Sequence, residues 1–313
     1  MVGKPHQNRT EITVTKNNKQ KIYDLTHAQH DRMHCLVPGL FRSLKRGERK
    51  KEKLDITYNY PNKKIRFTCF EPLGADDMKL LQFLVALGGV NKHSVLRVTD
   101  NLEDDIDKQL IQNFVAQRFE EYAQIIKIKI NSIHYLIKEM GLAASGNNVK
   151  RIKENMYRLK NVTIEEKFII NSEEYGVSHV YNLISEYLLN EKSGYFYVAL
   201  NPMIASAILG KSQFSHIDLN EIRSIKSAPT AIIHQHLCGW IDPGKAGNIG
   251  LDVLCSYPWP DEATNPETLR TRKLHAKKAL KELSNIGWTI TEIARNKWEI
   301  ARPNRRNIIE IKK

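Results

Sequence analysis

The segment Ile130–Ile170 restricts the possible folds of this chain more than any other part of it. Ser132 is placed to cap a short helix, IHYLIKEM, which Gly141 is expected to end. After the loop LAASGNN, apolar residues three, four and three apart predict a longer helix over residues 149–160. The next residues, VTIEEKFII, are rich in β-branched and apolar types and predict a strand. The predicted order is therefore helix, turn, helix and strand.

This order is typical of a winged helix, in which two helices joined by a short turn precede a β-hairpin. The strand VTIEEKFII would open the hairpin, and a later strand such as Tyr195–Leu200 would complete it. Earlier in the chain, alternating apolar residues predict another hairpin over 54–67, with its turn at Pro61-Asn62.

A helix is predicted over residues 74–89, after that hairpin. Asp76 and Asp77 fall in its first turn, where the helix dipole favours carboxylates, and Gly88-Gly89 is expected to end it. A metal site on the two carboxylates is the alternative. Adjacent helical side chains diverge, however, and the sequence offers no third ligand, so we interpret the pair as a helix start.

The C-terminal half repeats the order of the segment described first. Capping residues and prolines predict four helices, which begin at Asp218, at Ser227, near Leu251 and at Asn265. Glu221 would complete a capping box with Asp218. The last helix is expected to run to Gly287, followed by strands over 288–293 and 298–301 that form a wing.

We therefore expect an α+β protein with two tandem winged-helix domains and β-hairpin wings. The first domain is predicted to span residues 27–210 and the second, the main DNA reader, residues 211–302. Residues 1–26 carry few apolar side chains to bury and are predicted to be a flexible polar tail. Residues 303–313 are predicted to be a basic C-terminal tail.

The charge of the chain predicts a polyanionic partner. Its 48 Lys and Arg residues against 35 Asp and Glu residues give a formal net charge of +13. Nucleic acid is the first candidate and an anionic membrane the second. No apolar run approaches the roughly 20 residues of a membrane span, and the N-terminus lacks the apolar centre of a secretion signal, so we expect a cytoplasmic protein that does not act at a membrane. The four cysteines show no metal-binding spacing, which predicts isolated thiols.

The long C-terminal helix is the main candidate for DNA contact. One of its faces carries the basic residues Arg270, Lys273, Lys277, Lys278 and Lys281. The opposite face carries Leu269, Ala276, Leu280 and Leu283. No acidic residue occurs over 270–281, whereas solvated surface helices usually intersperse acids among their bases. We predict that base edges are reached by the first-turn residues Thr268, Arg270, Thr271 and Arg272, and phosphates by the remaining lysines.

Further DNA contacts are predicted on the second wing and on the earlier helix. The wing turn contributes Arg295, Asn296 and Lys297. The earlier helix contributes Lys150, Arg151, Lys153 and Arg158. Glu154 lies among these bases, so a packing or dimer role is equally open for that helix. The basic run over 42–51 would either touch phosphates or be a solvated charge run.

Two motifs raise the possibility of catalysis. In CGWIDPGKAG, Gly239 and Gly244-Lys245 are one residue short of a phosphate-binding loop, and Ala246 stands where its hydroxyl residue belongs. A tight turn at Asp242-Pro243-Gly244 explains the same letters, and we favour it. His234-Gln235-His236 resembles the metal pair of DNA-nicking replication enzymes, but on a helix these histidines point about 200° apart.

Five blocks of the sequence resemble the RepC replication initiators of IncQ-type plasmids. They are His34–Lys50 (HCLVPGLFRSLKRGERK), Glu71–Asp77 (EPLGADD), Tyr197–Pro202 (YVALNP), Leu237–Lys245 (LCGWIDPGK) and Gly287–Glu292 (GWTITE). The resemblance covers the chain from about His27 to Pro303. It departs from the family pattern in the two tails and around residues 94–123 and 171–193.

This resemblance implies two winged-helix domains in a protein of the bacterial cytoplasm. It further implies binding to direct repeats (iterons) in the vegetative origin, opening of an AT-rich segment, and recruitment of the plasmid helicase and primase. We expect double-stranded DNA as partner, self-association as a possible property, and no catalytic residue, metal or cofactor. The alternatives are a winged-helix transcriptional repressor and a metal-dependent nicking replication protein.

Overall fold

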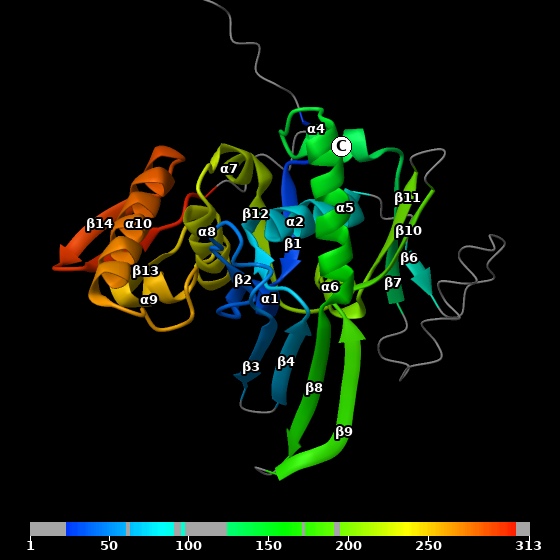
Figure 1. Ribbon diagram of the computed structural model, residues 1–313, viewed down its shortest axis with the longest axis horizontal. Coiled ribbons are helices and arrows are strands. Elements are labelled where there is room, and N and C mark those ends of the chain that lie inside the picture. Colours follow the sequence, from blue (N-terminus) through cyan, green and yellow to red (C-terminus); the bar gives the residue numbers. More distant parts are fainter. Residues whose placement is uncertain are drawn as a thin grey trace, which may run out of the picture.

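The structure of the protein, a computed structural model, describes residues 23–60, 63–90, 95–97, 124–170, 173–190 and 195–304. Most of both predicted tails (1–22 and 305–313) and the hairpin turn predicted at Pro61-Asn62 lie outside the described residues. The described part is a mixed α/β structure (Figure 1). None of its helices is long and apolar enough to cross a membrane.

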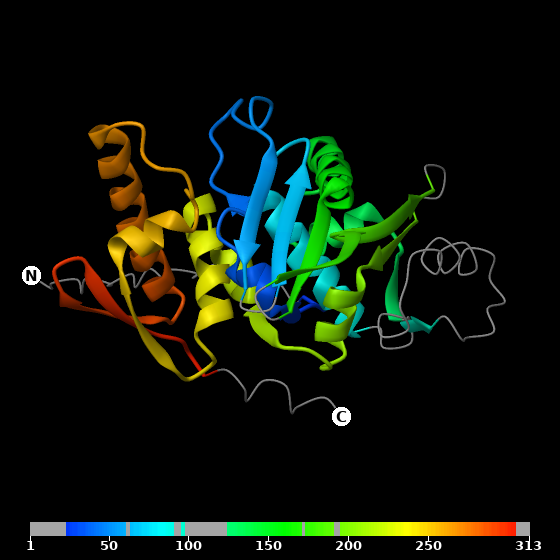
Figure 2. The ribbon, with the colours of Figure 1, turned by 90° about the horizontal axis from the view of Figure 1, so that it is seen from below.

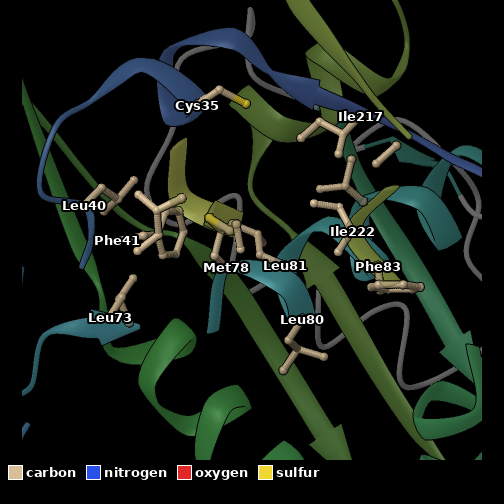
Figure 3. Packing of buried hydrophobic residues seen from close by; sticks show 14 of the residues in the cluster. Cys35, Leu40, Phe41, Leu73, Met78, Leu80, Leu81, Phe83, Ile217 and Ile222 are labelled. Atoms are coloured by element: carbon tan, nitrogen blue, oxygen red, sulfur yellow. The ribbon is translucent and has the colours of Figure 1, made fainter. Parts of the chain in front are cut away.

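Helix α2 (Ala75–Val90) lies at the centre of the molecule and is buried along most of its length (Figure 1). A helix that is apolar on nearly all sides belongs inside a core. Figure 3 shows buried side chains that meet in this core. Among them are Cys35 from α1 (Arg32–Leu36), Phe41 from β2 (Phe41–Arg42), Met78, Leu80, Leu81 and Phe83 from α2, and Ile222 from α7 (Leu219–Ser224).

The helix predicted over residues 74–89 is confirmed, with its last residue at Val90 instead of Gly89. Gly88 lies within it. A Cβ atom on Gly88 would lie 3.1 Å from Ile208 Cδ1 and 3.2 Å from Leu200 Cδ1. Contacts of that length leave little room for a methyl group, so Gly88 allows the neighbouring elements to approach the helix closely.

A four-stranded antiparallel sheet extends from one side of this core (Figure 1). Its order is β3 (Leu54–Asn59), β4 (Lys63–Cys69), β8 (Thr163–Ile170) and β9 (Glu173–Asn182). The hairpin predicted over 54–67 is confirmed by the pairing of β3 with β4, in which Ile56 lies opposite Phe67.

The prediction that residues 195–200 complete the first wing is wrong. Strand β8 pairs with β9, and Thr163 lies opposite Asn182. The sequence of β9, EEYGVSHVYN, contains Gly176 and several polar residues, so its strand signal is weak. It nevertheless pairs because closing a short loop costs less entropy than closing a long one.

Residues 196–200, which were predicted to complete the first wing, form a strand of a second four-stranded sheet instead. Its order is β10 (Ile184–Leu189), β11 (Phe196–Leu200), β7 (Gln124–Ile130) and β6 (Val95–Arg97). Strand β5 (Leu73–Gly74) pairs separately with β2.

Two helices follow β7, as predicted. Helix α4 (Ile133–Glu139) is capped by Ser132, which accepts a hydrogen bond from the Tyr135 N–H. Helix α5 (Gly146–Asn161) begins three residues before the predicted start, because the Ser145 side chain caps it by accepting from the Asn148 N–H. Helix α6 (Pro202–Ile208) comes later, after β11.

The C-terminal helices and the last hairpin follow the predicted order, whereas the strand between α8 and α9 was not predicted. The elements of this part are α8 (Ala228–Trp240), β13 (Ala246–Gly250), α9 (Leu251–Ser256), α10 (Pro266–Asn285), β14 (Thr289–Ala294) and β15 (Lys297–Ala301). The three strands form one sheet in the order β13-β15-β14. Figure 1 shows this group at one end of the molecule, with α10 beside the hairpin β14-β15.

The two predicted domains are in contact with each other. Strand β12 (Phe214–Asp218), which follows the predicted boundary at residue 210, pairs antiparallel with β1 (His27–Asp31). Helix α8 packs against α1 and α2 as well as against α10. Residues 23–26 of the predicted tail also pack on this body, since Leu25 is buried and its N–H donates to Glu139 Oε2 at 2.9 Å.

Helix α7 is capped by Asp218, as predicted. Asp218 Oδ1 accepts from the Asn220 and Glu221 N–H groups as expected. The Glu221 Oε2 atom accepts from His234 Nε2 at 2.7 Å and from Trp288 Nε1 at 3.0 Å. A buried carboxylate is retained where it receives such donors.

Candidate nucleic-acid interface

Helix α10 is positioned by its cap and by one apolar stripe. The Asn265 side chain accepts from the Thr268 N–H at 2.8 Å, and Pro266 occupies the first turn. Its buried residues are Ala276, Ala279, Leu280 and Leu283. Leu269 was predicted to belong to this stripe, but it is 40% exposed, because it lies in the first turns of the helix, before the buried residues begin.

The outward side of α10 is basic. Its exposed cations are Arg270, Lys277, Lys278 and Lys281, and Thr271 is exposed beside them. Unbroken positive charge on an exposed helix attracts phosphate and raises the association rate with a polyanion. The structure thus places five of the predicted DNA-contacting residues where a duplex has access to them.

Arg272 and Lys273 are oriented differently from these residues. The Arg272 guanidinium lies 6.0 Å from the centre of the Trp259 ring and donates to the Asp261 backbone oxygen. Lys273 Nζ lies 2.8 Å from Asp252 Oδ1 on α9. Both cations therefore hold α10 against the elements that precede it.

The wing turn presents two of its three predicted residues to solvent. Arg295 and Lys297 are exposed. Asn296 has a φ of 59°, a conformation that asparagine tolerates better than most residues. Its backbone oxygen accepts from the Leu251 N–H at 2.9 Å, so the turn is tied to the start of α9.

Helix α5 offers fewer available cations than predicted. Lys150 is exposed and lies 4.0 Å from Glu154 one turn away, while Arg151 and Lys153 are partly exposed. Arg158 is only 7% exposed, so the predicted DNA contact of this residue is wrong. The signal for its burial is absent from the local sequence because its carboxylate partners lie far away in the chain.

Arg158 belongs to a buried carboxylate network at the start of α2. Its Nε lies 3.0 Å from Asp77 Oδ1. Asp77 also accepts from Arg49 Nη1 at 2.7 Å and from the Gly74 N–H at 2.8 Å. Burial, with the nearby charge of Asp76, raises the pKa of Asp77 to about 6, against the opposing effect of the two arginines. The two carboxylates in the first turn of α2 therefore hold arginines.

The glycine-rich motif is a turn between a helix and a strand. It follows α8 and leads into β13, whereas a phosphate-binding loop follows a strand and leads into a helix. A Cβ on Gly239 would lie 2.9 Å from Cys35 Cβ, so this glycine lets α8 approach α1. Gly244 has a φ of 77° within the turn, and the Lys245 N–H donates to the Asp242 oxygen at 3.0 Å.

The structure of this turn predicts that Lys245→Ala leaves the nucleotide-binding properties of the protein unchanged. The exposed Lys245 side chain lies in a turn without the donor-lined cradle that a triphosphate requires. We expect no saturable ATP signal for either protein in isothermal titration calorimetry. A micromolar signal that is abolished by the substitution would contradict this interpretation.

The two histidines of α8 do not converge on a common ligand. His234 is buried, and although burial opposes its charged form, neighbouring Cys238 and Glu221 raise the pKa of His234. His236 instead stacks on Tyr257 with ring centroids 3.5 Å apart, and its burial lowers its pKa to about 3. Within the described residues, no group of three or more His, Cys, Asp or Glu side chains is arranged to hold a metal.

Comparison with known proteins places these observations in a wider group. The family model described as Replication protein C (RepC) matches residues 22–304. None of the curated proteins matches the chain in sequence.

Among solved structures, this chain is similar to domains 2 and 3 of RctB. One RctB structure has a TM-score of 0.55 at 10% identity, over 87% of this chain and 97% of that chain. Another has a TM-score of 0.52 at 11% identity, over 86% of this chain and 94% of that chain. A structure of the Pi initiator protein in complex with iteron DNA has a TM-score of 0.42 at 15% identity, over 72% of this chain and 89% of that chain. At this sequence identity, the similarity to RctB is a similarity of fold.

Proposed function

The chain belongs to the Replication protein C (RepC) family, and from this premise we propose that it is a replication initiator that binds repeated double-stranded DNA at a plasmid origin. The observation that carries this proposal is the outward side of α10, on which residues 268–281 include no acid. A helix of 20 residues is about 30 Å long, enough to lie in a major groove and contact the backbone on either side.

We assign the C-terminal elements to a winged helix with α10 as its recognition helix. The order from α8 to β15 and the pairing of β13 with β15 support this assignment. Arg270 and Thr271 then read base edges, and Lys277, Lys278 and Lys281 contact phosphates. Arg295 and Lys297 bring the wing to the neighbouring backbone.

In the first part of the chain we propose a second winged helix, which is formed by α4, α5 and the hairpin β8-β9. The start of α5 carries exposed Lys150 and partly exposed Arg151 and Lys153. Figure 2 shows α5 and α10 on the same side of the molecule. Gln82 Nε2 on α2 donates to Gln235 Oε1 on α8 at 2.6 Å, which supports a fixed spacing between the two DNA-binding surfaces.

The initiator is proposed to act without catalysis, to open a neighbouring AT-rich segment and to recruit the plasmid helicase and primase. A footprint on origin DNA tests repeat binding, and permanganate reactivity of nearby thymines tests strand opening. Protection of the repeats without permanganate reactivity would favour a repressor. A site-specific nick in supercoiled origin DNA with Mg²⁺ or Mn²⁺ would contradict the proposal of a non-catalytic initiator.

Leu274 is expected to contact a thymine methyl group. It is 52% exposed and lies four residues from both Arg270 and Lys278, on the outward side of α10. An apolar side chain in a major groove discriminates thymine by its methyl group. Replacing one particular thymine of the repeat by deoxyuridine should therefore weaken binding by about 0.8 kcal/mol, roughly fourfold in Kd.

The test of this contact is a comparison of variants on thymine and deoxyuridine duplexes. With Leu274→Ala, the loss at that position should disappear in fluorescence anisotropy titrations. Val90→Ala serves as the control, since Val90 is 64% exposed at the end of α2, which takes no part in the proposed interface. An equal response of wild type and Leu274→Ala at every thymine would contradict the contact.

A further inference from the structure

A basic loop, residues 43–53, lies between the two proposed DNA-binding helices (Figure 2, the blue loop that leads into β3). Its exposed side chains are Lys45, Arg46, Lys50, Lys51 and Lys53. None of these five forms an ion pair with the described residues. Charge runs are usually solvated faces, so the conformation of the loop decides whether it has a specific role.

One end of the loop is tied to the elements that precede α10. Arg42 Nη1, next to the loop, lies 2.9 Å from Asp261 Oδ2. The Ser43 N–H donates to the Pro258 oxygen at 2.9 Å. Asp261 also accepts from Arg272 of α10 through its backbone oxygen. Asp261 therefore links the loop to the recognition helix.

The other end of the loop is tied to the start of α2. Arg49 places its two terminal nitrogens 2.7 Å from Asp77 Oδ2 and 2.8 Å from Asp76 Oδ1. Asp77 in turn receives Arg158 of α5. The same carboxylate thus connects the basic loop with the second proposed DNA-binding helix.

The acids of the loop are engaged internally, which leaves its surface positive. Glu48 Oε2 accepts from the Lys45 N–H at 2.5 Å, and Glu52 Oε2 lies 3.3 Å from Arg42 Nη1. Holding the loop in one conformation before binding lowers the entropy that its ordering would otherwise cost. Anchored cations between two DNA-binding surfaces fit the phosphates that run from one surface to the other.

We propose that the basic loop is a third DNA contact, which binds the phosphate backbone between the segments bound by α10 and α5. This inference rests on the proposed function, because it takes origin DNA as the ligand. In this role the loop does not recognise the base sequence of the DNA. It holds the duplex along the side of the molecule that lies uppermost in Figure 2, and so sets the register between the two helices.

The test uses full-length protein in which Lys50→Ala and Lys51→Ala are combined. Binding to the cognate repeat and to random duplex should weaken by the same factor, and the slope of log affinity against log salt should fall by about one unit for each phosphate that the variant no longer binds. Hydroxyl-radical footprints should lose protection only between the segments protected by α10 and α5. The midpoint of thermal unfolding should stay unchanged, because both side chains are exposed.

Lys129→Ala is a control for the loss of positive charge outside the basic loop. Lys129 is exposed on β7, in the sheet at the far end of the molecule from α10. It should leave the salt slope unchanged, whereas a general loss of electrostatic attraction would affect both proteins alike. Equal slopes for the double variant and Lys129→Ala would overturn the proposal.

Two further outcomes distinguish failure of the loop contact from failure of the proposed function. If Lys278→Ala lowers the salt slope and the double variant does not, α10 binds DNA and the third contact is overturned. If the wild-type protein does not distinguish the repeat from random duplex, the proposed function itself fails. Loss of binding to phosphatidylserine vesicles by the double variant, with DNA binding intact, would assign the loop to a membrane and also overturn the proposal.

Discussion

Replacing Arg158 by alanine is expected to lower the free energy of unfolding by about 3 kcal/mol, because removal of one partner leaves a buried charge poorly compensated. The guanidinium is almost fully buried and lies 3.0 Å from Asp77 Oδ1. Arg49 Nη1 still lies 2.7 Å from Asp77 Oδ2 in this variant. The expected loss of unfolding free energy is therefore near the lower end of the range for broken buried ion pairs. Urea denaturation followed by circular dichroism measures the change.

Lys150→Ala is the control for this substitution, since Lys150 lies on the same helix with a side chain that is 79% exposed. Its unfolding free energy should change by no more than about 0.5 kcal/mol. Arg158→Lys should fall between the two, because a lysine keeps the charge but not the planar fork of donors. Wild-type stability of Arg158→Ala together with weaker DNA binding would restore Arg158 as a DNA contact.

Replacing Arg270 by alanine is expected to weaken binding to the cognate repeat by about 1–3 kcal/mol, and binding to random duplex much less. The reason is that Arg270 is exposed in the early part of α10, where we place base recognition, so its removal reduces discrimination. Replacing Lys277, Lys278 or Lys281 should instead weaken both complexes alike and lower the salt slope by about one unit where the lysine binds a phosphate.

Arg272→Ala is the matched control for Arg270→Ala, because it removes the same side chain two residues away. The structure directs Arg272 to Trp259 and Asp261, so its loss should reduce discrimination less than the loss of Arg270. Electrophoretic mobility shifts on cognate and random duplexes give both ratios. Equal loss of discrimination from Lys150→Ala or Arg151→Ala would show that α5 also reads the repeat, against the ranking of α10 as the main reader.

Local sequence signals were sufficient for most elements of the C-terminal part. The caps at Ser227 and Asn265, the turn before β13 and the two strands after α10 depend on residues within a few positions of one another. Capping, helical periodicity and turn preferences act over that range, so the sequence contains the relevant information. The basic side of α10 was predicted for the same reason, because residues three and four apart on a helix share a face.

Long-range contacts decided what these signals could not. Arg158 resembles its basic neighbours on α5, but a carboxylate 81 residues away buries it. Glu221 also accepts from His234 and Trp288, which are 13 and 67 residues away in the chain, and its local sequence does not indicate these partners. The conformation of the basic loop depends equally on residues distant in the chain. The sequence by itself determined most of the helices and the hairpins β3-β4 and β14-β15, whereas the tertiary structure determined which cations remain accessible, because burial and pairing depend on residues that folding brings together.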